Sequence, residues 1–239
     1  MATNYNPGIV TSGLVLCLDA GNIKSYPGSG SSWTDLSGNG NTGTLINSPT
    51  YSSSNGGILV FNGSNTYVDT AIKLFTAQQF TISFWIKPNS FSGNYCSGAV
   101  SNSLYSIFGT TSGYQGFTNT FSAGIQTAAG GNAVGTVNQS NYSTGIFYHY
   151  CAVYDGTQTG NAARLKLYIN GISKTLTYDS TIPSTPYNNN SNTRIGFGPG
   201  SPQYPYFDGS ISNVSYYNGI LSETEIINNF NALRGRFGL

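Results

Sequence analysis

The chain has 239 residues, of which 7% are charged, and nine Lys or Arg residues against eight Asp or Glu leave a formal net charge of +1. An average soluble domain carries about 25% charged residues, so this surface is built mainly from Ser, Thr, Asn, Gln, Tyr and Gly. The basic residues are scattered, which disfavours nucleic acid as a partner. The sequence has neither a signal-peptide pattern nor an apolar run of membrane-spanning length, so we expect no membrane partner.

The cysteines indicate packing rather than chemistry. Cys17, Cys96 and Cys151 are widely spaced and form no Cys-x-x-Cys pair, so the sequence predicts neither a zinc site nor a redox motif. Cys17 and Cys151 lie in apolar or aromatic runs. We expect both to be small buried hydrophobic residues.

The first half of the chain carries short strand patterns. Residues 13–18 form an apolar run, and residues 58–61 and 66–69 flank Asn62-Gly63, which predicts a hairpin. Residues 80–88 alternate, with Phe80, Ile82, Phe84 and Ile86 on one face, which predicts a half-buried strand.

The second half continues this pattern. Residues 148–154 and 165–169 are further strands, and Asn170-Gly171 joins the latter to residues 172–176 in the clearest hairpin signal. Two more strands are expected at 193–197 and 209–217. The intervening Gly-, Ser- and Asn-rich segments are interpreted as long loops of one sandwich: 26–41, 89–102, 127–143 and 183–192.

One helix is expected near the end of the chain. Ser222 and Glu225 fit a capping box, apolar residues follow at helical spacing, and Gly235 is placed to stop the helix. The chain is therefore predicted to be all-β with one short C-terminal helix over residues 222–234.

Several segments together resemble laminin-G-like domains of the concanavalin A-like lectin and glucanase superfamily. They are residues 13–20, 33–45, 61–68, 80–86, 154–156, 167–171, 207–217 and 221–226. The resemblance implies a jelly-roll sandwich of two antiparallel sheets, one concave, over residues 13–239, preceded by an N-terminal arm at 1–12. The amino-acid sequence of this domain, including residues 231–239, resembles laminin-G-like domains carried by tailed bacteriophages.

No catalytic centre is expected. Retaining glycosidases need two carboxylates about 5–5.5 Å apart, and the glucanases of the superfamily carry theirs on one strand. Here the two glutamates, Glu223 and Glu225, both fall in the predicted helix cap. The one histidine, His149, has no Gly-x-Ser-x-Gly partner motif and is predicted to be a partly buried strand residue with a backbone partner.

Calcium is the one cofactor that the resemblance implies, because several laminin-G-like domains hold it at the sandwich edge. Hard oxygen ligands occur in Asp35, Asn39, Asn41 and Asp208. Family members often carry an acid where Asn213 stands here, which lowers the charge of such a site. The alternative is that these side chains close the loop as Asx turns.

Aromatic residues in predicted loops are the candidates for carbohydrate binding, because their faces stack on sugar rings. They are Trp33, Tyr114, Phe117, Tyr204 and Tyr206. Tyr216 and Tyr217 are adjacent on one strand, so one of them must face outward. The same rings would also suit a protein interface.

Two functions follow as hypotheses. The first is a non-enzymatic phage virion structural protein, a capsid or tail decoration or fibre located in the virion. Its partners would be other virion proteins, in a homo-oligomer or a larger assembly. The alternative is a lectin-like adhesin that recognises host cell-surface glycans.

Overall fold

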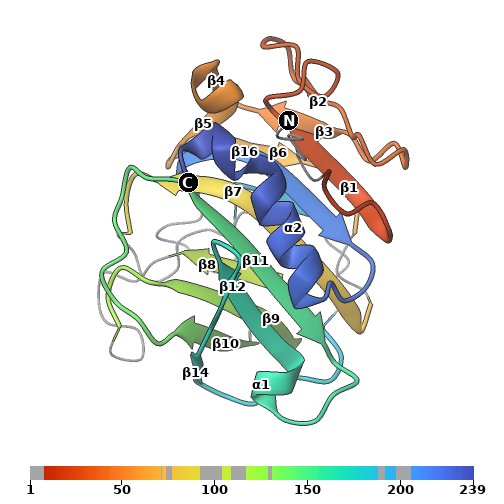
Figure 1. Ribbon diagram of the computed structural model, residues 1–239, viewed down its shortest axis with the longest axis vertical. Coiled ribbons are helices and arrows are strands. Elements are labelled where there is room, and N and C mark those ends of the chain that lie inside the picture. The colour runs from red at the N-terminus through yellow and green to blue at the C-terminus, as the bar shows by residue number, and fades with distance from the viewer. Residues whose placement is uncertain are drawn as a thin grey trace, which may run out of the picture.

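The chain folds into two layers of antiparallel sheet with a helix across the outer face of one layer (Figure 1). This is the computed structural model of the protein, and it describes residues 8–70, 72–73, 77–91, 104–108, 117–128, 131–187, 192–197 and 206–239. The predicted all-β jelly-roll class with one short C-terminal helix is confirmed.

One layer, the back sheet, has the strand order β13-β12-β11-β7-β16-β5-β4, and β1 also pairs with β16. The strands β5 and β1 pair with successive halves of β16. The bounds of the back-sheet strands are β1 (Leu14–Asp19), β4 (Thr50–Ser52), β5 (Ile58–Asn62), β7 (Gln79–Pro88), β11 (Tyr148–Asp155), β12 (Leu165–Ile169), β13 (Ile172–Lys174) and β16 (Asp208–Tyr217).

The front layer consists of two four-stranded sheets, with orders β15-β6-β3-β2 and β14-β10-β9-β8. The first contains β2 (Ser32–Trp33), β3 (Gly43–Ile46), β6 (Tyr67–Asp69) and β15 (Arg194–Ile195). The second contains β8 (Leu104–Phe108), β9 (Phe121–Ala128), β10 (Gly131–Val137) and β14 (Leu176–Tyr178). The short helices are η1 (Ser54–Gly56), α1 (Asn161–Arg164), α2 (Glu223–Leu233) and η2 (Arg234–Phe237).

The main core lies between the two layers. Alternate residues of β7, among them Phe80 and Phe84, point into it and belong to the same buried cluster as Val68 and Ile195 of the front layer. All four side chains are fully buried. The two-residue period of the strands thus supplies the apolar inner faces of both layers.

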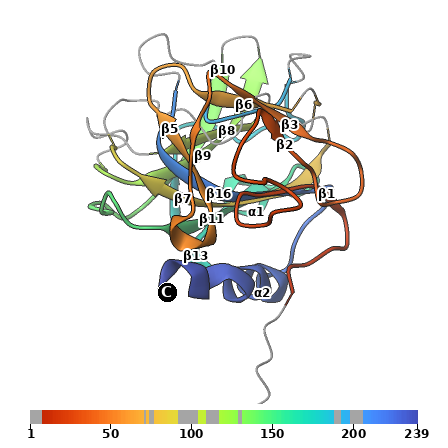
Figure 2. The ribbon, with the colours of Figure 1, turned by 90° about the horizontal axis from the view of Figure 1, so that it is seen from above.

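A second buried layer lies between the back sheet and the C-terminal helix. Trp85, on the outward face of β7, stacks on Phe237 and Phe230 with ring centroids 4.2 and 5.7 Å away. Strand β7 is therefore buried on both faces, and the half-buried prediction is wrong because α2 and η2 cover its outer side (Figure 2). Tyr217 faces outward as the alternation requires, yet it too is fully buried.

The segment before β1 is also fixed to this layer. The backbone N–H of Val10 donates to Asn229 Oδ1 at 2.8 Å, and Tyr217 donates to the Val10 carbonyl at 3.1 Å. Asn229 in turn donates to the Tyr217 hydroxyl. The described part of the N-terminal arm therefore lies against α2.

The hairpin predicted around Asn62-Gly63 is wrong. β5 belongs to the back sheet and β6 to the front layer, so the turn carries the chain across the sandwich. The Asn62 side chain accepts hydrogen bonds from the backbone N–H groups of Ser64, Asn65 and Thr66. This Asx-type turn holds the connection between the two layers.

The hairpin predicted at Asn170-Gly171 is confirmed for β12 and β13. Both turn residues have positive φ, 54° and 74°, as a type I′ turn requires. The strand predicted over 172–176 ends at Lys174, and β14 crosses to the front layer to pair with β10.

The capping box of the C-terminal helix is confirmed. Ser222 is the N-cap residue, and Glu225 and Ser222 satisfy each other's backbone donors. The α-helix ends at Leu233, just before Gly235 and within the predicted bounds of 222–234, and a 3₁₀ turn then continues through Gly235 to Phe237. That turn allows Phe237 to reach Trp85.

Strands β9 and β10 pair in the front layer. β10 falls in a segment predicted to be loop, so that prediction is wrong. Cys17 and Cys151 are buried as predicted, and Cys96 lies outside the described residues. Within the described residues, no helix is long and apolar enough to cross a membrane.

Candidate ligand-binding site

Three aromatic rings meet on the solvent side of the front layer. Tyr67 on β6 lies 5.5 Å from Phe197 and 6.3 Å from Tyr206, and Phe197 and Tyr206 are 5.1 Å apart, measured between ring centroids. All three are partly exposed. We call this group the ring cluster.

Polar groups border the ring cluster. The Arg194 guanidinium lies 5.0 Å from the centroid of Phe197 and 5.4 Å from that of Tyr67. Its Nε is 3.5 Å from Asp69 Oδ2, and Asn192 donates to Asp69 Oδ1 at 3.2 Å. The site thus combines aromatic faces with hydrogen-bond donors and acceptors, the composition that suits a polar ligand with an apolar face.

The strand alternation explains this placement. Val68 and Ile195 point into the core, so their neighbours Tyr67 and Arg194 point to solvent. Gly196 then turns the chain with φ of 79°, and a Cβ there would lie 2.7 Å from the buried Phe61 ring. Glycine therefore lets Phe197 form its bridge with Tyr206.

Of the aromatic residues predicted from the sequence, Tyr206 lies in the ring cluster. Trp33 is fully buried in the main core, so the prediction that its face stacks on a sugar is corrected. It packs inward because it falls on strand β2 rather than in a loop. Phe117 is partly buried next to the β9 segment, and Tyr114 and Tyr204 lie outside the described residues.

Sequence reasoning missed Tyr67, Phe197 and Arg194. The position of Tyr67 could have been predicted, because residues two apart in a strand share a face. Tyr67 and Asp69 therefore point one way and Val68 points the other. No sequence pattern indicated that β15 would pair with β6 and bring Arg194 beside Asp69.

The predicted calcium ligands separate into two places. Asp35, Asn39 and Asn41 share one loop, whereas Asp208 begins β16 and accepts a hydrogen bond from Asn89. The loop contacts Cys17, which pairs with Ser215. Seven residues of extended strand separate Ser215 from Asp208, a span of about 23 Å.

The Asp35 carboxylate is occupied by donors from the protein. Oδ1 accepts from the N–H groups of Cys17 and Ser37, and Oδ2 accepts from the Ser37 hydroxyl and the Asn41 N–H. The side-chain amides of Asn39 and Asn41 donate to the Val15 carbonyl. These contacts match the Asx-turn alternative and do not fit a cation site. Within the described residues, no group of three acidic, His or Cys side chains is placed to hold a metal.

The family profile described as the Concanavalin A-like lectin/glucanases superfamily matches residues 62–227. The chain belongs to this superfamily. The matched stretch includes all of the ring cluster. No curated protein sequence matches the chain.

Solved structures of similar fold include both enzymes and binding domains. Domain 4 of AbnA, a GH43 extracellular arabinanase from Geobacillus stearothermophilus, solved with arabinotriose, has 18% identity and a TM-score of 0.54, covering 90% of this chain and 97% of that one. The binding domain of Paraclostridial Mosquitocidal Protein 1 has 18% identity and a TM-score of 0.62, covering 92% and 52%. Trypanosoma rangeli sialidase in complex with sialic acid has 16% identity and a TM-score of 0.59, covering 94% and 33%. The chain thus spans about half of the toxin domain and a third of the sialidase.

Because this superfamily contains glucanases, the surroundings of each acid bear on catalysis. All eight lie in the described part of the chain, and each accepts a hydrogen bond from within the protein. Glu223 accepts from the Tyr168 hydroxyl, and Glu225 caps its helix. The other contacts are those of Asp19, Asp35, Asp69, Asp155, Asp179 and Asp208.

His149 is placed beneath the C-terminal helix. Its Nε2 lies 2.7 Å from the Ser83 hydroxyl, and its ring contacts Trp85 and Phe230. The prediction of a partly buried histidine with a backbone partner is corrected, because the residue is fully buried and its ring bonds the Ser83 side chain. Burial lowers the pKa of His149 from 6.5 to about 3, so the ring is neutral at physiological pH.

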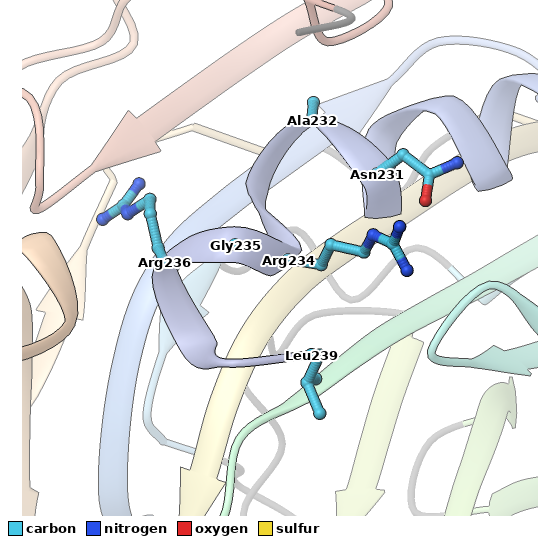
Figure 3. A pocket seen from close by; sticks show the side chains of 6 residues that line it. All are labelled: Asn231, Ala232, Arg234, Gly235, Arg236 and Leu239. Carbon is cyan, nitrogen blue, oxygen red and sulfur yellow. The ribbon is translucent and has the colours of Figure 1, made fainter. Parts of the chain in front are cut away.

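A shallow hollow lies at the C-terminal end of α2. Its lining consists of Asn231, Ala232, Arg234, Gly235, Arg236 and Leu239 (Figure 3). The two arginines point away from each other, and Arg236 is engaged with Asp19. The hollow therefore lacks the convergent polar groups of a ligand site.

Proposed function

We propose that this domain is a non-enzymatic carbohydrate-binding module and that the ring cluster is its binding site. The observation that carries the proposal is the meeting of Tyr67, Phe197 and Tyr206 beside Arg194 and Asp69. The apolar face of a sugar stacks on an aromatic ring, while its hydroxyls take donors and acceptors at the border.

The similar structures support this class of function. A domain of nearly the same extent was solved with arabinotriose, and a toxin domain of similar fold is a binding domain. At 18% identity these similarities support only a shared fold. The ring cluster is the argument that is specific to this chain.

The distribution of acids supports a non-catalytic role. A retaining or inverting glycosidase needs two carboxyl groups facing a substrate, and here each acid already accepts a hydrogen bond from a group of the protein. The buried Ser83 and His149 pair lies under α2, where no substrate reaches it.

A glycan-array screen of the full chain tests the proposal, followed by affinity measurements with Tyr67→Ala and Tyr206→Ala. Each variant should weaken sugar binding about tenfold or more, which corresponds to about 1.4 kcal/mol. Tyr187→Ala is the matched control, since Tyr187 is another exposed tyrosine, 37% exposed, whose ring is not part of the cluster. Wild-type affinity in both cluster variants would overturn the site, and no bound glycan would overturn the function.

We further propose that the module is displayed on a bacteriophage virion, as a capsid or tail decoration or fibre. The resemblance of the sequence to phage-borne domains supports this setting. The charged fraction of 7% supports it too, since a weakly charged surface repels its neighbours little in a dense array. A host-surface glycan would then be the ligand. Purified particles should contain the protein by mass spectrometry, and a monomer that never sediments with particles would contradict the proposal.

A further inference from the structure

Arg194 contacts two aromatic rings and one carboxylate through its guanidinium at the ring cluster. Its guanidinium lies over two rings, Phe197 and Tyr67, at 5.0 and 5.4 Å from their centroids. Its side chain is 36% exposed, although it stands between two aromatic neighbours and an acid. The cation is therefore partly accessible to solvent.

The ion pair with Asp69 is loose. The distance from Arg194 Nε to Asp69 Oδ2 is 3.5 Å, whereas a charge-assisted N–H···O⁻ bond is typically about 2.7–2.9 Å. Within the described residues, Nε has no hydrogen-bond partner. Asp69 accepts a hydrogen bond from Asn192 at 3.2 Å, so the carboxylate is not engaged by Arg194 alone.

The donors at the tip of Arg194 remain for a ligand. A guanidinium carries five N–H donors in a planar fork, and the pair with Asp69 approaches the Nε side. In the described part of the chain, the contacts of this guanidinium are Asp69 and the two rings. The Nη edge of such a fork matches a carboxylate in two parallel hydrogen bonds.

We propose that the ring cluster binds a sugar that carries a carboxylate, with the carboxylate on the Nη edge of Arg194 and the sugar ring against Tyr206 or Tyr67. This inference rests on the proposed carbohydrate-binding function and specifies its ligand class. A purely structural Arg194, one that only fastens β15 to β6, would give no preference between acidic and neutral sugars.

The test uses sugar probes in matched pairs: glucuronate and glucose oligomers, galacturonate and galactose oligomers, and sialyllactose and lactose. Wild-type protein should bind the acidic member of at least one pair about tenfold more tightly at low salt. The preference should shrink as ionic strength rises, because exposed charges are screened. Arg194→Gln should abolish the preference while leaving weak binding of the neutral member.

Two further variants keep the outcome interpretable if Arg194→Gln folds poorly. Asp69→Asn keeps the cation and removes the nearby negative charge, so it should tighten binding of the acidic probe several-fold. Lys166→Gln removes an exposed cation on β12, outside the ring cluster, and should leave the affinity for every probe unchanged.

Equal affinity for both members of every pair, with Asp69→Asn unchanged, would overturn this inference and leave the carbohydrate-binding function standing. Failure of all six probes and of the glycan array would overturn the carbohydrate-binding function itself.

Discussion

Arg236 Nη1 donates to both carboxylate oxygens of Asp19, at 2.9 and 3.0 Å. Its Nη2 donates to the Ser212 hydroxyl at 2.9 Å. The contact joins the turn after α2 to the end of β1 and to β16. It therefore attaches the C-terminal segment at the end of β1, whereas Asn229 contacts Val10 before the start of that strand.

Replacing Arg236 should destabilise the domain. The side chains of Arg236 and Asp19 are 22% and 14% exposed, so the partners left behind lose charge-assisted bonds in a largely buried place. We expect Arg236→Ala to lower the free energy of unfolding by about 2–3 kcal/mol in urea denaturation. Arg234→Ala is the control, because Arg234 points the other way (Figure 3) and contacts the Phe230 ring. An equal decrease in the free energy of unfolding in both variants would show that the ion pair with Asp19 does not stabilise the domain.

His149 should make stability fall in mild acid. Its pKa is about 3 when folded and about 6.5 when unfolded, so below pH 6.5 the unfolded chain takes up a proton that the folded chain does not. The free energy of unfolding should drop by up to about 1.4 kcal/mol per pH unit, or about 2 kcal/mol from pH 6.5 to 5. Denaturation curves should have a flatter pH dependence in this window for His149→Gln. The same slope in both proteins would contradict a neutral buried imidazole.

The helix cap offers a smaller and cleaner test. Ser222→Ala removes the side-chain acceptor for the Glu225 N–H and one partner of the Glu225 carboxylate, so it should cost about 1 kcal/mol. Thr224→Ala, two residues away on the exposed face of α2, should be neutral or slightly stabilising, since Ala is the better helix former. Thermal melts that rank the two variants in the reverse order would contradict the capping box.

Calcium should leave the domain unchanged. Because four protein donors already fill the Asp35 carboxylate, we expect the same melting temperature in millimolar calcium and in chelator. Asp35→Ala should destabilise the domain under both conditions by about 2–3 kcal/mol, since it leaves buried N–H groups without acceptors. A calcium-dependent rise in melting temperature that Asp35→Ala abolishes would establish a metal site here instead.

The sequence predicted those elements that depend only on residues close together in the chain. The Asn170-Gly171 turn and the Ser222 cap each depend on residues within a few positions, and both are present. It failed for β10, where Ala133 and Val134 are adjacent and glycine and polar residues interrupt the two-residue alternation, although the strand pairs with β9. Such strands are stabilised by pairing across the sheet, which local propensity does not report.

The candidate site was predictable only in part, for a related reason. Tyr206 was identified as an aromatic residue in a predicted loop, whereas its neighbours Tyr67 and Phe197 come from segments that meet only through the folded front layer. Trp33 was misassigned because a two-residue strand was hidden in a Gly- and Ser-rich stretch. Long-range pairing decided which rings face solvent.

The position of α2 has a practical consequence for orientation. The helix, and Val10 bound to it, lie on the outer side of the back sheet, while β3 and β6 lie on the opposite side of the sandwich (Figure 2). A carrier, resin or particle joined near Val10 or Phe237 would hold the domain by one side and leave the ring cluster turned away from the point of attachment. Fusion or immobilisation at either place should therefore preserve access to the site, and several copies on one support would present it in the same direction.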